Sequence, residues 1–158
     1  MSEIENLAQE LLLLNEEELT TKLGLLDRDL NAGVRGAASV QYLESMPEPR
    51  AGLDDLLKIG QNLFGPASAG LYKILCSDVG EVVKDSELAQ QLTELMNQKN
   101  AEASAKAAAL ITPLLTSGGL PQSMAVMIGA LIVKKLAKGS SDFICTKWQQ
   151  NIGVVADP

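Results

Sequence analysis

Apolar residues recur every three or four positions along most of this chain, which is the spacing that places them on one face of an α-helix. The first apolar stripe predicts a helix over residues 3–14. Asn15 and Glu18 then have the spacing of a capping box, in which two side chains accept hydrogen bonds from backbone N–H groups at a helix start. We therefore expect a second helix to begin at residue 16 and to end at Asn31–Gly33, because glycine favours the backbone turn that ends helices.

Four leucines of the second helix form a narrow apolar seam at a 4-3-4 spacing: Leu19, Leu23, Leu26 and Leu30. Such a seam is typical of a helix that packs against one other helix. Because the seam lies near the N-terminus on a glutamate-rich helix, we expect it to be a contact edge for a partner protein or for a second copy of the chain. The alternative is that the seam belongs to the core, in which case Leu23→Glu would lower the helical content.

Prolines mark the next change in the chain. Residues 34–45 predict a weaker, alanine-rich helix, and the two prolines of MPEPR (46–50) predict an extended connector. We place a domain boundary there. It separates an acidic helical subdomain (1–46) from a helical bundle (50–150), which a loose tail (151–158) follows. A single domain is the alternative.

Glycine and proline also indicate where helices of the predicted bundle begin and end. The Gly65–Pro66 pair predicts the end of one helix and the first turn of the next. The segment SDVGEVVKDSE (77–87) predicts a short helix or turn, and Ser86 is expected to cap a long helix. The polar continuation of that helix, residues 97–106, is either an exposed stretch of helix or a hinge, and its strong helix formers favour the first.

Residues 107–133 contain no charged side chain. The segment TSGGLP (116–121) interrupts them, so each arm is short. At about 1.5 Å per residue the longer arm reaches roughly 20 Å, less than the roughly 30 Å of a bilayer core. The pattern therefore predicts an αα-hairpin over residues 107–137, with a second arm that is apolar on nearly all sides and buried. We expect this hairpin to be the centre of the fold.

The hairpin also contains candidate binding residues. Its arms would place four side chains where they could line a pocket for an apolar small molecule: Leu110, Leu114, Met124 and Met127. Gly129 follows Ala125 by four positions, a spacing that allows another helix to approach closely. Three lysines end the second arm: Lys134, Lys135 and Lys138. They suit the negative end of a helix dipole, or alternatively a phospholipid headgroup layer. A last helix should place Phe143, Ile144 and Trp148 over the hairpin as a lid.

Composition supports an all-α fold, a compact bundle of about seven or eight short helices. The 158 residues are 46% hydrophobic but only 3% aromatic, so leucine, alanine, valine and isoleucine must form the core. The net charge of −7 argues against nucleic acid as a partner, because phosphates require a basic surface. The charge is uneven: residues 1–106 carry 18 acidic and 9 basic side chains, and residues 107–158 carry 2 and 4.

Candidate chemistry is sparse. The chain has no histidine, which excludes histidine-dependent catalysis and histidine metal sites, and no phosphate-binding glycine motif. Cys76 and Cys145 are isolated and cannot complete a zinc site. We therefore expect no enzyme activity, no metal and no cofactor. The acidic first residues lack the basic region of a secretory signal, so we expect a cytoplasmic protein with two reduced thiols, with a Cys76–Cys145 bridge as the alternative.

The sequence thus favours a non-enzymatic helical module for protein–protein interaction or oligomerisation, with the leucine seam as its contact edge. One alternative is a membrane-active protein whose hairpin (107–137) enters a bilayer. A weaker alternative is an apolar small-molecule binder.

Overall fold

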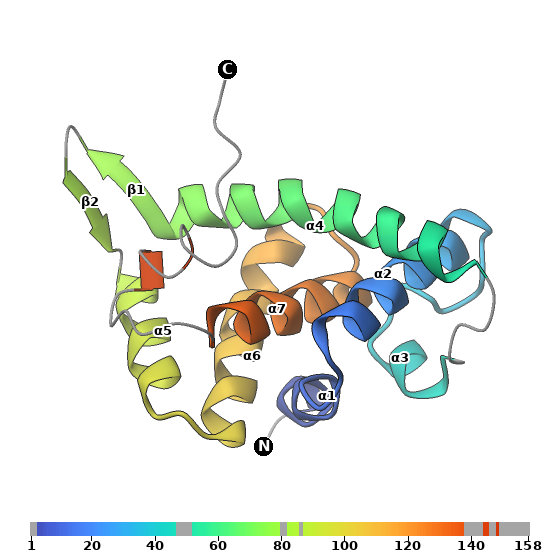
Figure 1. Ribbon diagram of the computed structural model, residues 1–158, viewed down its shortest axis with the longest axis horizontal. Helices are drawn as coiled ribbons and strands as arrows, with labels where there is room; N and C mark the ends of the chain where they lie inside the picture. The colour runs from blue at the N-terminus through green and yellow to red at the C-terminus, as the bar shows by residue number, and fades with distance from the viewer. Residues whose placement is uncertain are drawn as a thin grey trace.

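The computed structural model describes residues 3–46, 52–79, 82–85, 87–137, 144–145 and 148. Over these residues the fold is all-α, as the sequence predicts, with one small β-hairpin added (Figure 1). The elements in chain order are α1 (Glu3–Leu11), α2 (Glu16–Asn31), α3 (Gln41–Ser45), α4 (Leu53–Leu75), β1 (Cys76–Val79), β2 (Val82–Asp85), α5 (Glu87–Asn97), α6 (Ala101–Ser117) and α7 (Gln122–Leu136).

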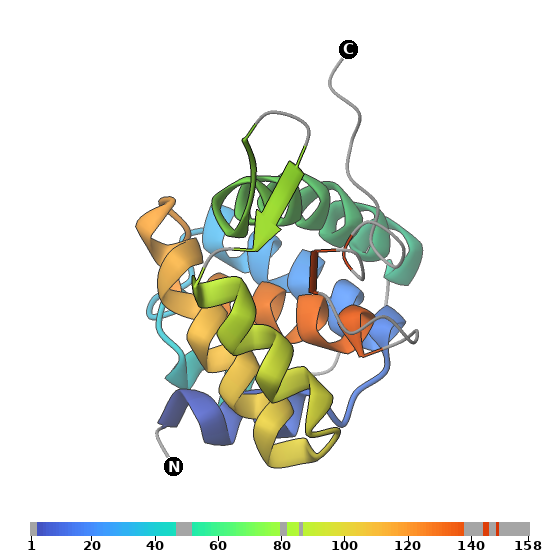
Figure 2. The same ribbon diagram turned by 90° about the vertical axis from the view of Figure 1, so that its left-hand side faces the viewer.

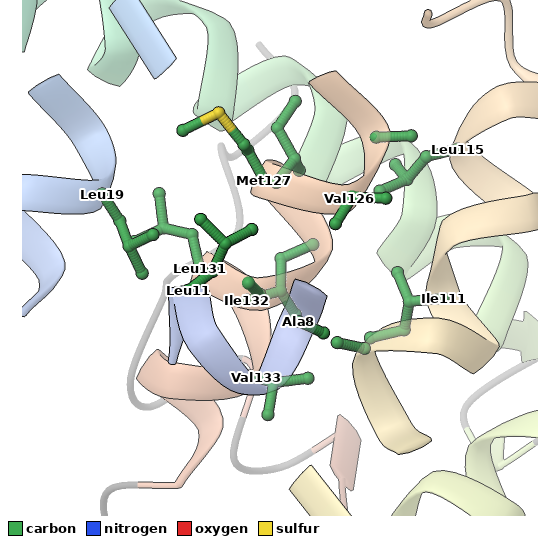
Figure 3. Close-up of a cluster of buried hydrophobic side chains, with 14 of the residues drawn as sticks. Ala8, Leu11, Leu19, Ile111, Leu115, Val126, Met127, Leu131, Ile132 and Val133 are labelled. Atoms are coloured by element: carbon green, nitrogen blue, oxygen red, sulfur yellow. The ribbon is translucent and has the colours of Figure 1, made fainter. Parts of the chain in front are cut away.

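Helix α7 is the centre of the fold. It contacts α1, α2, α3, α4 and α6, which surround it (Figure 1, Figure 2). All its residues from Ser123 to Val133 are buried, and Leu136 as well. Figure 3 shows side chains of α1, α2 and α6 gathered around it. A helix enclosed on all sides must be apolar all round, because a buried charge without a partner is costly. The predicted hairpin with a buried second arm is therefore confirmed.

The two arms of the hairpin approach closely at Gly129. A Cβ atom at this position would stand 3.3 Å from the carbonyl oxygen of Ala108 and 3.4 Å from the hydroxyl of Thr112, both on α6. Thr112 is buried, and its hydroxyl donates a hydrogen bond of 2.8 Å to the Ala108 carbonyl. The predicted close approach at Gly129 is thus confirmed, and α6 is the helix that makes it.

Helices α2 and α4 make a second, closer contact. A Cβ atom on Gly24 would lie 2.0 Å from the carbonyl oxygen of Leu56, and one on Gly60 would lie 2.0 Å from the carbonyl oxygen of Thr20. Residue 20 of α2 lies beside residue 60 of α4, and residue 24 lies beside residue 56, so the two helices are antiparallel. Each helix thus presents a glycine to the backbone of the other, which brings the two backbones into direct contact.

Local signals place the start of α2 correctly. The N–H of Glu18 donates to Oδ1 of Asn15 over 2.8 Å, and the N–H of Asn15 donates to Oε1 of Glu18 over 3.5 Å, which is the predicted capping box. Gly33 follows the helix with a φ of 75°. The alanine-rich helix predicted over residues 34–45 is wrong in extent, because only Gln41–Ser45 is helical and turns precede it.

The predicted break at Pro66 is wrong, since α4 continues through it from Leu53 to Leu75. An internal proline costs a helix about 3 kcal/mol, through one lost hydrogen bond and a steric clash. Leu56, Phe64, Leu71 and Leu75 lie on the core side of α4 on both sides of the proline and are all buried. Burial of each contributes about 1.5–3 kcal/mol, so packing of the whole helix outweighs the cost.

Two connections also differ from the prediction. The segment predicted as a short helix or turn is an antiparallel hairpin in which Val79 pairs with Val82, which agrees with the preference of valine for strands. Helices α5 and α6 are separate, because Lys99 adopts a φ of 54° and Asn100 caps α6 by accepting a 2.7 Å hydrogen bond from the N–H of Ala103. The expected cap at Ser86 lies outside the described residues.

One apolar core joins the first 46 residues to the rest of the described chain. Leu7 and Ala8 of α1 and Leu23 of α2 belong to the same buried cluster as the side chains of α4, α6 and α7. Ser123 at the start of α7 reinforces this connection, because its hydroxyl donates to the carbonyl of Ala37 over 2.6 Å. The N-terminal helices therefore share their core with the bundle. The predicted loose tail (151–158) lies outside the described residues.

Candidate functional site

The leucine seam of α2 lies inside the molecule. Leu19 has 1% of its surface exposed, and Leu23 and Leu26 have none, while Leu30 is partly buried against the core. The expectation that the seam forms a contact edge does not hold for the folded chain, because buried side chains offer no surface to a partner. Periodicity alone could not predict this burial, because it does not show which helices will cover an apolar stripe. In the structure α2 packs against both α4 and α7.

The four candidate pocket residues of the hairpin belong to one core cluster but are buried to different degrees. Met124 and Met127 of α7 are buried in the core, and Figure 3 shows Met127 within the central cluster. Leu110 and Leu114 lie at the edge of the core on α6 and are partly buried. Leu114 lines a surface groove that is described below.

Two of the three hairpin lysines contact this chain. Lys134 Nζ donates a hydrogen bond of 2.8 Å to the carbonyl of Leu12, just after α1. Lys135 Nζ lies 3.3 Å from Oε1 of Glu16 and 5.4 Å from the centre of the Phe64 ring. These contacts tie the end of α7 to α1, α2 and α4. Lys138 lies outside the described residues.

A groove on the surface between α4 and the end of α6, which we call the α4–α6 groove, has a volume of about 420 Å³. Its lining residues are Asn62, Leu63, Pro66, Ala67, Gly70, Leu71, Ile74, Leu114, Leu115, Gly118 and Leu120. None of them is charged. Ile74 stands at one end of the groove with 56% of its surface exposed, which makes it one of the few large apolar side chains of the described chain that face solvent.

Exposed residues of the α4–α6 groove follow one face of α4. Asn62, Pro66, Gly70 and Ile74 follow one another at four-residue intervals and are exposed, so they form a stripe along α4. Proline has no N–H, so the carbonyl of Asn62 lacks the donor that a regular helix would supply. The lining contains no nucleophile and no acid or base, so it can hold apolar groups but offers nothing for catalysis.

A second hollow is polar and lies between the starts of α2 and α4. It measures about 270 Å³ and is lined by Asn15, Glu17, Glu18, Thr21, Lys22, Leu53 and Asp54. Asn15 and Glu18 already bind each other's backbone in the capping box. No group of three histidine, cysteine, aspartate or glutamate side chains that could hold a metal ion occurs among the described residues.

Two residues of the predicted C-terminal lid, Ile144 and Trp148, make hydrogen bonds to α5 and α4. Trp148 is completely buried; its indole N–H donates to the hydroxyl of Ser68 over 2.8 Å, and its ring meets Tyr72 edge-on at 6.1 Å. The N–H of Ile144 donates to the hydroxyl of Thr93 over 3.3 Å. The prediction placed these side chains over the hairpin, whereas their hydrogen bonds go to α4 and α5. Phe143 lies outside the described residues.

Cys145 in the same segment is disulfide-bonded. The expectation of two reduced thiols is therefore wrong. The side chain of Cys76 lies outside the described part of the structure. Disulfides persist mainly in oxidising compartments, so the bond weighs against the expected cytoplasmic location.

Comparison with known proteins gives no relative: no protein-family model, no curated protein and no solved structure matches this chain. None of the described helices has both the length and the apolar character needed to cross a membrane. The α4–α6 groove presents an uncharged, largely apolar surface that is open to solvent.

Proposed function

We propose that this protein is a non-enzymatic interaction module that binds the uncharged face of an α-helix in the α4–α6 groove. The observation that carries the proposal is the exposed stripe Asn62, Pro66, Gly70 and Ile74, which has an apolar wall of α6 beside it. Apolar surface left open to water is a liability unless it binds something. The leucine seam, which is core, has no part in this proposal.

The dimensions of the groove favour a helix as the occupant. The stripe runs from residue 62 to residue 74, which is about 18 Å of helix at 1.5 Å per residue. This length matches three turns of a bound helix, whose apolar residues at positions i, i+3 or i+4 and i+7 would lie along it. The absence of charge in the lining selects against helices with an acidic or basic face, because a charge placed there would lose its water without gaining a partner.

The test is a titration of isotope-labelled protein with a synthetic helical peptide that has leucine and alanine on one face and both charges on the other. We expect chemical-shift changes centred on residues 62–74 and 114–120. Ile74→Lys should abolish them, because it places a charge in the groove. Gln61→Lys is the matched control, because Gln61 is an exposed residue on the opposite face of α4 and should leave binding unchanged.

Three results would contradict the proposal. Shift changes that avoid the groove, or that survive Ile74→Lys, would place the binding surface elsewhere. Flotation of the folded protein with lipid vesicles, in place of peptide binding, would favour the membrane-active alternative. In that case the buried α7 must leave the five helices that contact it.

We also propose an oxidising compartment, in place of the cytoplasm, as the location of the protein. The support is the disulfide at Cys145. Alkylation of free thiols during isolation from the natural source tests this, and a protein isolated with two alkylated cysteines would restore the cytoplasmic expectation.

A further inference from the structure

We infer that the disulfide at Cys145 is a redox-sensitive switch, which keeps one face of α4 covered while it is oxidised and uncovers that face when it is reduced. The inference does not depend on the α4–α6 groove. Its starting observation is that a disulfide-bonded cysteine stands between Ile144 and Trp148, the two residues that link α5 to α4.

Ile144 and Trp148 connect helices that pack mainly on other elements. The N–H of Ile144 donates to the hydroxyl of Thr93 on α5, and the indole N–H of Trp148 donates to the hydroxyl of Ser68 on α4. Among the described elements, α5 packs chiefly against α6, and α4 chiefly against α2. The two residues therefore form a bridge between α5 and α4.

Trp148 covers one face of α4. Its ring is completely buried and meets the ring of Tyr72, which lies one helical turn after Ser68. At about 100° per residue, Ser68 and Tyr72 lie on the side of α4 roughly opposite to Gly70, which lines the groove. Withdrawal of Trp148 would therefore expose an aromatic ring and a hydroxyl on a face of α4 that is separate from the groove.

The covalent bond decides whether this face stays covered. Fixing a chain segment in place costs conformational entropy for each residue, and a disulfide lowers that cost by restricting the unfolded segment. Ile144 and Trp148 follow α7 in the chain, so their withdrawal leaves the contacts among α1, α2, α4, α6 and α7 in place. A region of this kind can open locally while the rest of the molecule stays folded.

The redox step requires a dithiol as reductant. The dithiol supplies two electrons and two protons, the S–S bond at Cys145 breaks to give two thiols, and the reductant closes its own disulfide. Cys145 is only 4% exposed, so the attacking thiolate reaches it when the contacts of Ile144 and Trp148 open transiently. After reduction no covalent bond returns the segment to α4, and the face stays uncovered until the thiols are oxidised again.

The fluorescence of Trp148 tests the switch directly, because it is the single tryptophan of the chain. Dithiothreitol added to the folded protein should shift the emission to longer wavelength and raise its quenching by acrylamide several-fold. The far-UV circular dichroism should stay unchanged, and reoxidation should reverse the emission shift. Alkylation of thiols followed by mass measurement shows in the same samples whether the bond is reduced.

Two variants complete the test. Cys145→Ser should have the long-wavelength emission without any reductant, and dithiothreitol should change it no further. Ser68→Ala removes the hydrogen bond to Trp148 but keeps the disulfide, so its tryptophan should stay shielded from acrylamide until dithiothreitol is added.

Three results would overturn the inference. A bond that resists dithiothreitol in the folded protein is no switch, and an unchanged emission after complete reduction would show that the contacts hold without the bond. Loss of circular dichroism together with the emission shift would show that the disulfide supports the whole fold. If Cys145→Ser does not fold, reduction of the wild type alone decides among these outcomes. All of them leave the proposed function standing, because the peptide titration tests the groove separately.

Discussion

The same substitution at two glycines of α4 should change stability in opposite directions. Gly60 and Gly70 lie in one helix, ten residues apart, but Gly60 touches α2 whereas Gly70 faces empty space. Alanine in place of glycine stabilises a helix interior by roughly 0.5–1 kcal/mol, because it restricts the unfolded chain. At Gly70 nothing opposes this gain, so Gly70→Ala should raise the free energy of unfolding by about that amount.

At Gly60 the new methyl group collides with backbone. Its Cβ would stand 2.0 Å from the carbonyl oxygen of Thr20, whereas ordinary contact begins at 3.4 Å. Helices α2 and α4 must therefore separate by more than 1 Å, and a backbone carbonyl cannot rotate away as a side chain can. Overpacking of this kind costs about 1–3 kcal/mol, and the rigid neighbour favours the upper end. After the helix gain is subtracted, we expect Gly60→Ala to lower the free energy of unfolding by about 2 kcal/mol.

Urea unfolding followed by circular dichroism measures both changes. In a chain of this length 1 kcal/mol corresponds to a melting shift of about 2–4 °C, so thermal unfolding should separate the variants as well. Gly24→Ala should resemble Gly60→Ala, and the double variant should lose less than the sum, because one separation of the helices relieves both collisions. If Gly60→Ala is as stable as the parent protein, the close α2–α4 crossing described above is wrong.

Three further predictions concern other contacts. Ser68→Ala should lower the free energy of unfolding by about 1–2 kcal/mol, because it leaves the buried Trp148 N–H without its acceptor; an unchanged urea midpoint would contradict that hydrogen bond. Reduction with excess dithiol should lower stability by about 2–4 kcal/mol through loss of the Cys145 disulfide, and equal melting temperatures with and without reductant would argue against the bond. The hydrogen bond that the Tyr42 hydroxyl donates to Asp29 raises the pKa of Tyr42 above 10, the ordinary value for tyrosine. This hydrogen bond should therefore stabilise the fold fully below pH 10, and the stabilisation should be lost as the pH rises through the raised pKa. Tyr42→Phe should therefore flatten the alkaline loss of stability, and identical pH profiles would refute this.

Interactions between residues close together in the sequence were sufficient to predict several elements. The Asn15–Glu18 capping box predicts the start of α2, because its hydrogen bonds connect residues only three apart. The uncharged stretch with its Gly118–Gly119 interruption predicts the α6–α7 hairpin and the burial of its second arm. That inference needs no knowledge of neighbours, because a helix without a polar face must be enclosed somewhere.

Features that depend on distant segments were not predictable in this way. Pro66 is a local signal for a helix end, but α4 continues because core residues before and after it pack together against α2, α6 and α7. The 77–87 segment forms strands, and the seam leucines are buried, for the same reason: packing with other segments, not local preference, decides the outcome.

The candidate site belongs to the second group. Residues 62–74 and 114–120 are separated by about forty positions, and no periodicity in either segment indicates that they border one groove. The amino-acid sequence by itself determined the helical class, the central hairpin and the absence of histidine chemistry. The tertiary structure alone decided which apolar faces are covered, because the burial of each face depends on how all the helices pack together. On α4 this packing leaves the stripe from Asn62 to Ile74 facing solvent.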